Sequence, residues 1–272
     1  MTSIDEQLPV ITEEAVPVWN GRLTIRVKVA GAGKPVVYLH PAGGLRWDPF
    51  LSHIARDHTV YAIEFPGTSV GDPYAIHLVD RLSDVVLIYE EVLRVLGLNR
   101  PVIIAQSFGG MLAAELVAAY PNIATKVILL DPIGLWREDL PIAVWIATAP
   151  QDMPALLFHD PTCLAAQSML APPEDPDIAA AAIAAQTWAI GATAKFVFPI
   201  PDRGLRARLH RVTAPVLVVW GRQDRLIPAD YAEEWKKELA DVRIALIDDC
   251  GHVPQAEKLD ETLTVVEQFL TA

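Results

Sequence analysis

The 272-residue chain is long enough for one large domain or two small ones, and its 52% apolar content supports a sizeable core. No stretch of about 20 residues is free of polar side chains, which argues against a membrane-spanning helix. The formal net charge of −12 disfavours nucleic acids and anionic membrane surfaces as partners.

The N-terminal part of the chain contains short strand signals separated by turns. Residues 1–7 are acidic and lack the apolar core of a signal peptide. Asn20-Gly21 is a strong two-residue turn signal, and it joins residues 16–19 to the alternating residues 22–29 as a hairpin. The apolar runs at 35–40 and 58–65 predict two buried strands, with a short helix over 47–56 between them.

The next part of the chain alternates helix and strand. Apolar side chains recur at three- and four-residue steps from residue 75 to 98, which predicts one amphipathic helix ending at Gly97. A strand over 101–105, a helix over 111–120 and a strand over 125–130 follow. This alternation predicts parallel strands joined by right-handed crossovers, in a sheet covered by helices on both faces.

The pattern changes after residue 131. Residues 132–212 contain no strand run, only helical pieces split by prolines, and several aromatic side chains lie among them. The sheet resumes at 216–220 and 242–247, with helices over 229–239 and 257–270. We therefore predict an α/β fold with a mostly parallel, twisted sheet of about eight strands. A helical cap at about 132–212 is inserted after the sixth strand, into a core made of residues 1–131 and 213–272.

A serine between small residues joins the strand at 101–105 to the helix that follows. The sequence Ala105-Gln106-Ser107-Phe108-Gly109 matches the nucleophile elbow G-x-S-x-G, with alanine at the first position. The chain must turn from strand to helix within about two residues, so the serine backbone is strained and its neighbours must be small. The turn lifts the hydroxyl clear of the strand, beside helix N-terminal amides. Taken alone, the pattern also fits an ordinary strand-to-helix turn.

An acid and a base follow Ser107 at the ends of two later strands. The loop after 216–220 contains Asp224, and the loop after 242–247 contains His252. Parallel strands bring their carboxyl ends to one edge of the sheet, where open α/β proteins bind ligands. A serine hydroxyl needs a base to take its proton, and the base needs an acid to hold it in place. Asp224 and His252 thus lie where these partners are needed.

These motifs resemble those of α/β-hydrolase-fold enzymes of the capped, serine-nucleophile kind. Residues 221–228 match G-x-x-D-x-x-x-P, residues 251–254 match G-H-x-P, and the resemblance covers nearly the whole chain. It implies a catalytic triad in which Ser107 is the nucleophile, His252 the general base and then acid, and Asp224 the orienting acid.

The same resemblance implies an oxyanion hole made of two backbone N–H groups. One belongs to Phe108, the residue after the nucleophile. The other comes from the loop after an early strand, where the family's H-G-x-G is replaced by H-P-A-G-G at residues 40–44. Pro41 has no N–H to donate, so Ala42 is the favoured second donor, with Gly43 next.

Two further polar residues follow strand ends. Asp131 could serve as the triad acid in a variant arrangement, but we favour a place at the start of the hinge that leads into the cap. His40 lies beneath the predicted oxyanion loop, where support of the loop by hydrogen bonding is favoured over proton transfer.

Nothing in the sequence indicates a metal or a cofactor. His53 and His58 have no carboxylate partner at a metal-ligand spacing, and the chain has no zinc-protease, phosphate-loop or dinucleotide motif. Cys163 and Cys250 form no C-x-x-C and no disulfide framework, which is typical of a reducing cytoplasm.

We expect a cofactor-free serine hydrolase that acts on small or medium apolar carboxylic esters through an acyl-enzyme. An alternative, suggested by the cap placement and the S-F-G-G elbow, is a carbon–carbon bond hydrolase of the meta-cleavage-product type, with a diketone substrate. A third alternative is a ligand-binding protein with a silent triad on the same scaffold. Some of the cap aromatic residues should line an apolar pocket for the acyl or alcohol group, with four candidates: Trp136, Trp145, Phe158 and Trp188.

Overall fold

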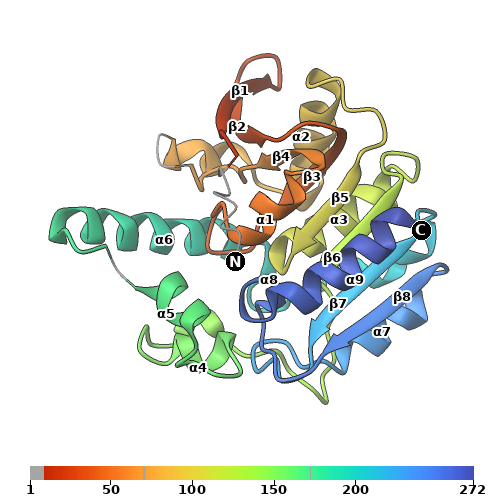
Figure 1. Ribbon diagram of the computed structural model, residues 1–272. Helices are drawn as coiled ribbons and strands as arrows, with labels where there is room; N and C mark the ends of the chain where they lie inside the picture. The colour runs from red at the N-terminus through yellow and green to blue at the C-terminus, as the bar shows by residue number, and fades with distance from the viewer. Residues whose placement is uncertain (1–8, 70–71, 172) are drawn as a thin grey trace, which may run out of the picture.

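The computed structural model describes residues 9–69, 72–171 and 173–272, and the acidic start at residues 1–7 lies outside them. One eight-stranded sheet runs through the molecule in the order β1-β2-β4-β3-β5-β6-β7-β8 (Figure 1). The strands are β1 Thr12–Val18, β2 Leu23–Ala30, β3 Lys34–Leu39, β4 His58–Ile63, β5 Val102–Gln106, β6 Lys126–Leu130, β7 Val216–Gly221 and β8 Val242–Ile247.

The sheet is antiparallel at one side and parallel through the rest. The β1–β2 and β2–β4 pairs are antiparallel, whereas the pairs from β4 to β8 are parallel. The predicted hairpin forms, and its turn uses positive φ values at Trp19, Asn20 and Gly21. The prediction of a mostly parallel sheet of about eight strands is therefore confirmed.

Helices cover both faces of the sheet (Figure 1). Alternate side chains of β6 show the two layers: Val127 and Leu129 face one apolar core, while Ile128 and Leu130 face the other. The first core is completed by α2 Leu82–Val95, α3 Phe108–Ala119 and α7 Tyr231–Glu238, and the second by α1 Pro49–Ile54 and α9 Leu259–Thr271.

The single helix predicted over 75–98 is wrong. The chain forms a short 3₁₀ helix, η1 Pro73–Leu78, and then the separate helix α2. The Asp84 carboxylate accepts the Arg81 N–H at 3.0 Å and starts α2 there. Lys195, from far along the chain, donates to the Val79 carbonyl at 2.6 Å and so satisfies a backbone group at the break. The break therefore depends on polar contacts that the apolar spacing does not reveal.

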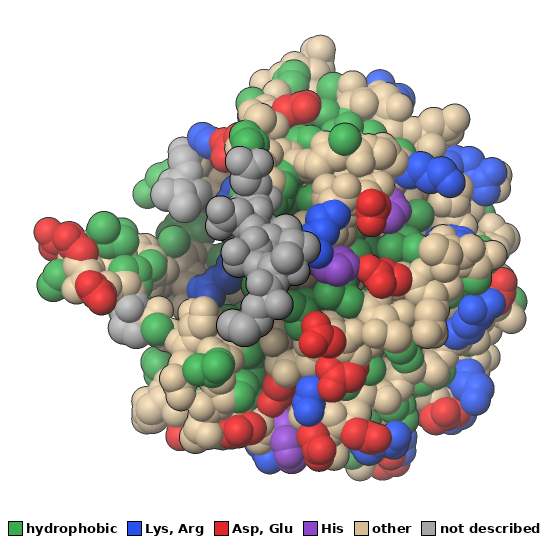
Figure 2. All heavy atoms as spheres, in the orientation of Figure 1, with side chains coloured by type: hydrophobic (Ala, Val, Ile, Leu, Met, Phe, Trp, Pro, Cys, Tyr) green, Lys and Arg blue, Asp and Glu red, His purple; other side chains and the backbone are tan. Residues whose placement is uncertain are grey.

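The regular elements described between β6 and β7 are all helices. These are η2 Trp145–Ala147, α4 Met153–Leu157, α5 Leu164–Leu170, α6 Pro176–Val197 and η3 Arg206–Arg211, while α8 Pro254–Glu257 follows β8. The first half of α6 projects away from the body of the molecule (Figures 1 and 2). Ile178 and Ile183 on it are 59% and 60% exposed, whereas Phe196 at its other end is buried.

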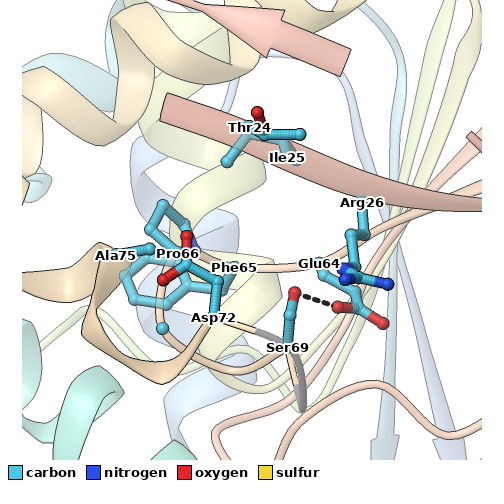
Figure 3. A pocket seen from close by; sticks show the side chains of 10 residues that line it. Thr24, Ile25, Arg26, Glu64, Phe65, Pro66, Ser69, Asp72 and Ala75 are labelled. Carbon is cyan, nitrogen blue, oxygen red and sulfur yellow. Dashed lines mark hydrogen bonds between the residues drawn. The ribbon is translucent and has the colours of Figure 1, made fainter. Parts of the chain in front are cut away.

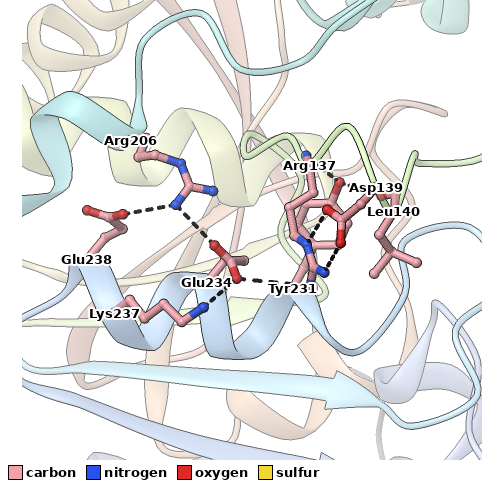
Figure 4. A network of polar contacts seen from close by, with 8 residues as sticks. All are labelled: Arg137, Asp139, Leu140, Arg206, Tyr231, Glu234, Lys237 and Glu238. Carbon is pink, nitrogen blue, oxygen red and sulfur yellow. Dashed lines mark hydrogen bonds and ion pairs between the residues drawn. The ribbon is translucent and has the colours of Figure 1, made fainter.

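Both ends of this helical segment are tied to α7 (Figure 4). Arg206 donates to the carboxylates of Glu234 and Glu238 at 3.1 and 2.9 Å. Tyr231 accepts the Arg137 N–H through its hydroxyl at 2.9 Å and donates to the Leu140 carbonyl at 2.8 Å. Partly exposed ion pairs contribute little stability, so this network mainly fixes where the segment leaves and rejoins the sheet.

No helix among the described residues is long and apolar enough to cross a membrane.

Candidate active site

Ser107 occupies the sharp turn between β5 and α3. Its backbone has φ 52° and ψ −111°, a conformation that is strained for a residue other than glycine. Three backbone hydrogen bonds hold it there. Ser107 donates its N–H to the Leu130 carbonyl at 2.8 Å, and its own carbonyl accepts from Met111 and Ile133, each at 3.2 Å. The predicted elbow therefore forms at the carboxyl end of β5.

Gly109 shows why the elbow needs small residues. A Cβ atom at this position would lie 2.1 Å from the Leu39 carbonyl oxygen and 2.7 Å from that of His40. The first turn of α3 thus rests directly on the backbone at the end of β3. Only glycine allows this approach, and the approach places the helix N-terminus beside the loop that follows β3.

The structure brings Ser107, Asp224 and His252 together at the carboxyl edge of the sheet. His252 Nε2 lies 2.9 Å from Ser107 Oγ, and His252 Nδ1 lies 2.7 Å from Asp224 Oδ2. All three residues are less than 9% exposed. This is the geometry in which an imidazole can take a proton from a serine hydroxyl while a carboxylate holds the ring.

Both carboxylate oxygens of Asp224 are engaged in hydrogen bonds. Its Oδ1 accepts the backbone N–H groups of Leu226 at 2.8 Å and Ile227 at 2.9 Å, while Oδ2 faces His252. A carboxylate that accepts three hydrogen bonds is stabilised in its charged form. His252 then donates from Nδ1 and leaves Nε2 free to accept from the Ser107 hydroxyl.

The loops that carry the acid and the base are packed backbone against backbone. A Cβ atom on Gly221 would lie 1.9 Å from the carbonyl oxygen of Gly251. Gln223 donates its N–H to the Cys250 carbonyl at 2.8 Å, and its side chain accepts the Cys250 N–H at 3.0 Å. These contacts fix the separation between the Asp224 loop and the His252 loop.

The backbone of His252 is held from two sides. Its N–H donates to the Leu157 carbonyl at the end of α4 at 2.7 Å, and its carbonyl accepts from Gln106 Nε2 at 3.1 Å. Gln106 stands inside the elbow motif directly before Ser107, but the sequence analysis assigned it no role. Its position next to the nucleophile was the signal that could have identified it.

Glu257 is a second supporting residue that the sequence analysis missed. Its carboxylate accepts the backbone N–H of Gly251 at 2.7 Å, of Asp160 at 2.9 Å and of His159 at 3.1 Å. One side chain therefore fastens the segment after α4 to the loop that carries His252. No local pattern around residue 257 indicates this, because two of the three donors lie almost 100 residues earlier.

His40 is buried under the loop that follows β3. Its Nδ1 donates to the Pro41 carbonyl at 2.7 Å, and its Nε2 accepts the Phe65 N–H at 2.9 Å. Burial lowers the pKa of His40 from 6.5 to about 4, so the ring is neutral near neutral pH. This neutral ring joins the loop after β3 to the end of β4 by hydrogen bonds.

The amides predicted to form the oxyanion hole are not used by other hydrogen bonds in the described part of the chain. Phe108 is the first residue of α3, so its N–H has no partner within the helix. In the described part of the chain, no hydrogen bond occupies the amide of Ala42 or that of Gly43, whereas Gly44 donates its N–H to Pro41 at 3.2 Å. Ala42 also accepts from the Thr193 hydroxyl of α6 through its carbonyl, at 3.2 Å. Both candidate amides therefore stay available as the second donor.

The four aromatic residues expected to line a pocket lie in three separate places. Trp136 and Trp145 line a cavity of about 40 Å³ that none of the triad residues lines. Phe158 is completely buried and packs with Ala166 and Val253. Trp188 is 39% exposed, and its indole donates to the Pro73 carbonyl at 2.7 Å. The structure thus does not gather the four side chains around Ser107.

A cavity of about 190 Å³, lined by both polar and apolar residues, lies beside β2 and is also separate from the triad (Figure 3). Arg26, Glu64 and Asp72 line it, and the Ser69 hydroxyl donates to the Glu64 carboxylate. Phe65 forms part of its wall and packs edge-on against the ring of Phe108 at 5.0 Å between ring centres. The candidate site is thus the buried triad, and this cavity is not part of it.

Most of the chain matches one protein family. Residues 36–265 match the model of the alpha/beta hydrolase family. The chain belongs to this family. The resemblance inferred from the motifs is therefore confirmed, and so is the α/β-hydrolase fold.

Relatives of this alpha/beta hydrolase carry the names of different hydrolases. The chain is 26% identical to 2-hydroxy-6-oxo-6-phenylhexa-2,4-dienoate hydrolase of Comamonas testosteroni, over 90% of this chain and 91% of the relative. It is 27% identical to Lipase 1 of Psychrobacter immobilis, over 88% of this chain and 77% of the relative. The structure of naproxen esterase from Bacillus subtilis shares the fold with a TM-score of 0.76 at 17% identity, covering 96% of this chain and 92% of that one.

The buried His40 of this alpha/beta hydrolase should make the fold sensitive to acid. Between pH 6.5 and about 4 the unfolded chain binds a proton that native His40 does not, so the stability falls as the pH falls. Between pH 7.5 and pH 4.5, we expect the native protein to lose about 2–3 kcal/mol more unfolding free energy than His40→Asn. Denaturant titrations at both pH values measure this difference. His210→Asn, at an exposed histidine, is the control, and equal losses in the native protein and His40→Asn would contradict the assignment.

Glu257→Gln should slow the reaction of Ser107 because it removes the charged acceptor that positions the His252 loop. We expect a fluorophosphonate probe to label Ser107 at least about fivefold more slowly, equivalent to roughly 1 kcal/mol of lost positioning. Labelling reactions that are quenched at successive times and analysed by mass spectrometry measure the rate. Glu267→Gln, on the exposed side of α9, is the matched control and should stay within about twofold of the native rate. Equal rates in both variants would show that the Glu257 contacts do not position His252.

Proposed function

We propose that the protein is a serine hydrolase that cleaves small or medium apolar carboxylic esters through an acyl-enzyme. The observation that carries the proposal is the position of His252, 2.9 Å from the Ser107 hydroxyl and 2.7 Å from the Asp224 carboxylate in a buried site. Its relatives include a lipase, and the fold is shared with an esterase, which supports ester chemistry.

In the proposed reaction, Ser107 Oγ bonds to the ester carbonyl carbon while His252 Nε2 takes the hydroxyl proton. The carbonyl oxygen becomes an oxyanion and accepts hydrogen bonds from the amides of Phe108 and of Ala42 or Gly43. His252 returns its proton to the departing alkoxide, which leaves as the alcohol. Water then attacks the acyl-enzyme with His252 again as base, and the carboxylic acid and free Ser107 result.

Residues 132–212 are proposed to act as the cap that closes the acyl or alcohol pocket over Ser107. Thr193 on α6 contacts the carbonyl of Ala42, so the end of α6 already lies against the proposed oxyanion loop. Gln186, about two α6 turns further from the body, lies close to Gly43. This makes α6 the element of the cap best placed to meet a bound substrate.

Carbon–carbon bond hydrolysis is the second candidate. The Comamonas relative that matches 90% of this chain is named for a dienoate substrate, and the elbow ends in S-F-G-G. The same Ser107 and His252 arrangement could serve either bond, because both reactions require a base, an activated oxygen nucleophile or water, and oxyanion donors. The choice between the two therefore depends on the pocket.

Removal of the serine should abolish turnover while the fold remains. Ser107→Ala and His252→Ala are each expected to lower kcat by roughly 10⁴-fold or more on a nitrophenyl ester. Asp224→Asn should lose a comparable factor, because the amide favours the wrong tautomer of His252. Ser83→Ala, at an exposed serine of α2, is the control. Full activity in Ser107→Ala, with circular dichroism unchanged, would refute the mechanism. Saturable ligand binding without serine-dependent turnover would indicate a binding protein.

A substrate panel should separate the two candidate reactions. We expect nitrophenyl esters of short and medium acyl chains to be cleaved with a pre-steady-state burst, while vinylogous diketones are cleaved at least about 100-fold less efficiently by kcat/KM. Stopped-flow absorbance with both substrate classes measures the ratio. A higher kcat/KM for the diketones, lost in Ser107→Ala, would assign the protein to carbon–carbon bond hydrolysis instead.

A further inference from the structure

A second aspartate lies behind the triad and takes no part in the reaction described above. Asp131 follows β6 directly, is completely buried, and has a positive φ of 44°. Its N–H donates to the Val219 carbonyl at 2.9 Å, and its Oδ1 accepts the Gly221 N–H at 2.9 Å. Its other oxygen, Oδ2, is buried and accepts no conventional hydrogen bond from the described residues.

Asp131 belongs to a tight cluster of side chains. One side-chain atom each of Asp131, Asp224 and His252 lie within 4.8 Å of one another. Both ring nitrogens of His252 are already engaged, by Asp224 and by Ser107, so the cluster is held together by hydrogen bonds. The remaining question for Asp131 is whether it is charged.

Two ionised carboxylates at this distance in a dry site would repel each other strongly, so one of them must keep a proton. Among the residues that the structure describes, Asp224 accepts three hydrogen bonds, whereas Asp131 accepts one, from Gly221. Burial, then the charge of Asp224, and then a hydrogen bond shared with Asp224 raise the pKa of Asp131 well above its ordinary value. The proton therefore stays on Asp131, and Oδ2 is the oxygen without another partner to hold it.

We propose that Asp131 is a positioning residue of this active site, a neutral carboxylic acid whose O–H donates to the Asp224 carboxylate. The proposal rests on the proposed role of Asp224 as the triad acid. It has two consequences. The hydrogen bond fixes the orientation of Asp224, and the pair presents one negative charge to His252 where two aspartates would otherwise present two.

The other groups around Asp131 are consistent with a single charge. Asp224 faces it from the β7–α7 loop, Ser107 lies at the end of β5, and His252 and Cys250 lie in the β8–α8 loop. Burial raises the pKa of the Cys250 thiol, so the thiol is neutral as well. Asp224 is thus the one anion that His252 meets in this cluster.

Infrared spectroscopy tests the protonation state without any turnover. In purified full-length protein at pH 8, we expect the carbonyl band of a neutral carboxyl group, and we expect Asp131→Asn to lack it. Asp48→Asn is the matched control. Burial raises the pKa of Asp48 to about 6, so this aspartate is ionised at pH 8 and its loss should leave the band in place. The absence of the band from the native protein, or its persistence in Asp131→Asn, would overturn the proposal.

The pH dependence of the Ser107 reaction tests the link to His252. Asparagine mimics a neutral Asp131, because its amide can accept from Gly221 and donate to Asp224. In Asp131→Asn, the midpoint of the acid limb of the pH–rate profile for Ser107 labelling should therefore stay within about 0.3 pH unit of the native value. Asp131→Ala removes the donor to Asp224 and should move the midpoint of this acid limb to a higher pH, by about 0.5–1 pH unit. If Asp131 is ionised in the native protein, asparagine removes a charge and moves the acid limb downward by about 1 unit or more, which would overturn the proposal.

Fluorophosphonate labelling of Ser107 supplies these pH profiles whichever substrate the enzyme uses. Unchanged labelling in His252→Ala would show that the proposed triad fails, and the infrared band would still report on Asp131. Labelling that depends on His252, together with a missing infrared band, would overturn the Asp131 proposal alone. If Asp131→Ala does not fold, Asp131→Asn and the infrared measurement decide the question.

Discussion

The close approach of α3 to the end of β3 is the constraint on which the site depends. Gly109 lies so near the Leu39 carbonyl that any side chain would collide with it, and it follows Phe108 and the positive-φ turn of Ser107. The same contact points the N-terminus of α3 at the loop after β3. Ser107 and the proposed oxyanion donors are therefore positioned by the same backbone packing, and the loops of Asp224 and His252 extend to this position.

Features that follow from local sterics could be predicted from the sequence. The small residues around Ser107 reflect a turn that excludes larger ones, and the runs of apolar residues reflect strands that are buried on both faces. Because parallel strands end at one edge, the positions of Asp224 and His252 after their strands were enough to predict that they would meet. The eight strands and their mostly parallel arrangement followed from the same patterns.

Features that depend on long-range polar contacts could not be predicted in this way. The break between η1 and α2 needs Lys195, which is 116 residues from the Val79 carbonyl that it binds. Glu257 binds the amides of His159 and Asp160, which are almost 100 residues away. The aromatic residues between β6 and β7 indicated an apolar segment, but composition does not specify that Phe158 is packed inside it while Trp188 lies at its surface.

Three carboxyl groups converge on the loop of His252, and each is accommodated differently. Glu257 accepts hydrogen bonds from backbone N–H groups that also hold the loop, and Asp224 is bonded to two amides and the imidazole. Asp131 has one amide and retains its proton. In the proposed reaction the imidazole gains a positive charge during attack by Ser107, and that charge forms next to a single carboxylate held by hydrogen bonds. A second full negative charge would hold the imidazolium more tightly and make it a poorer acid toward the leaving group. Retention of a proton by Asp131 thus keeps His252 able both to take and to return a proton.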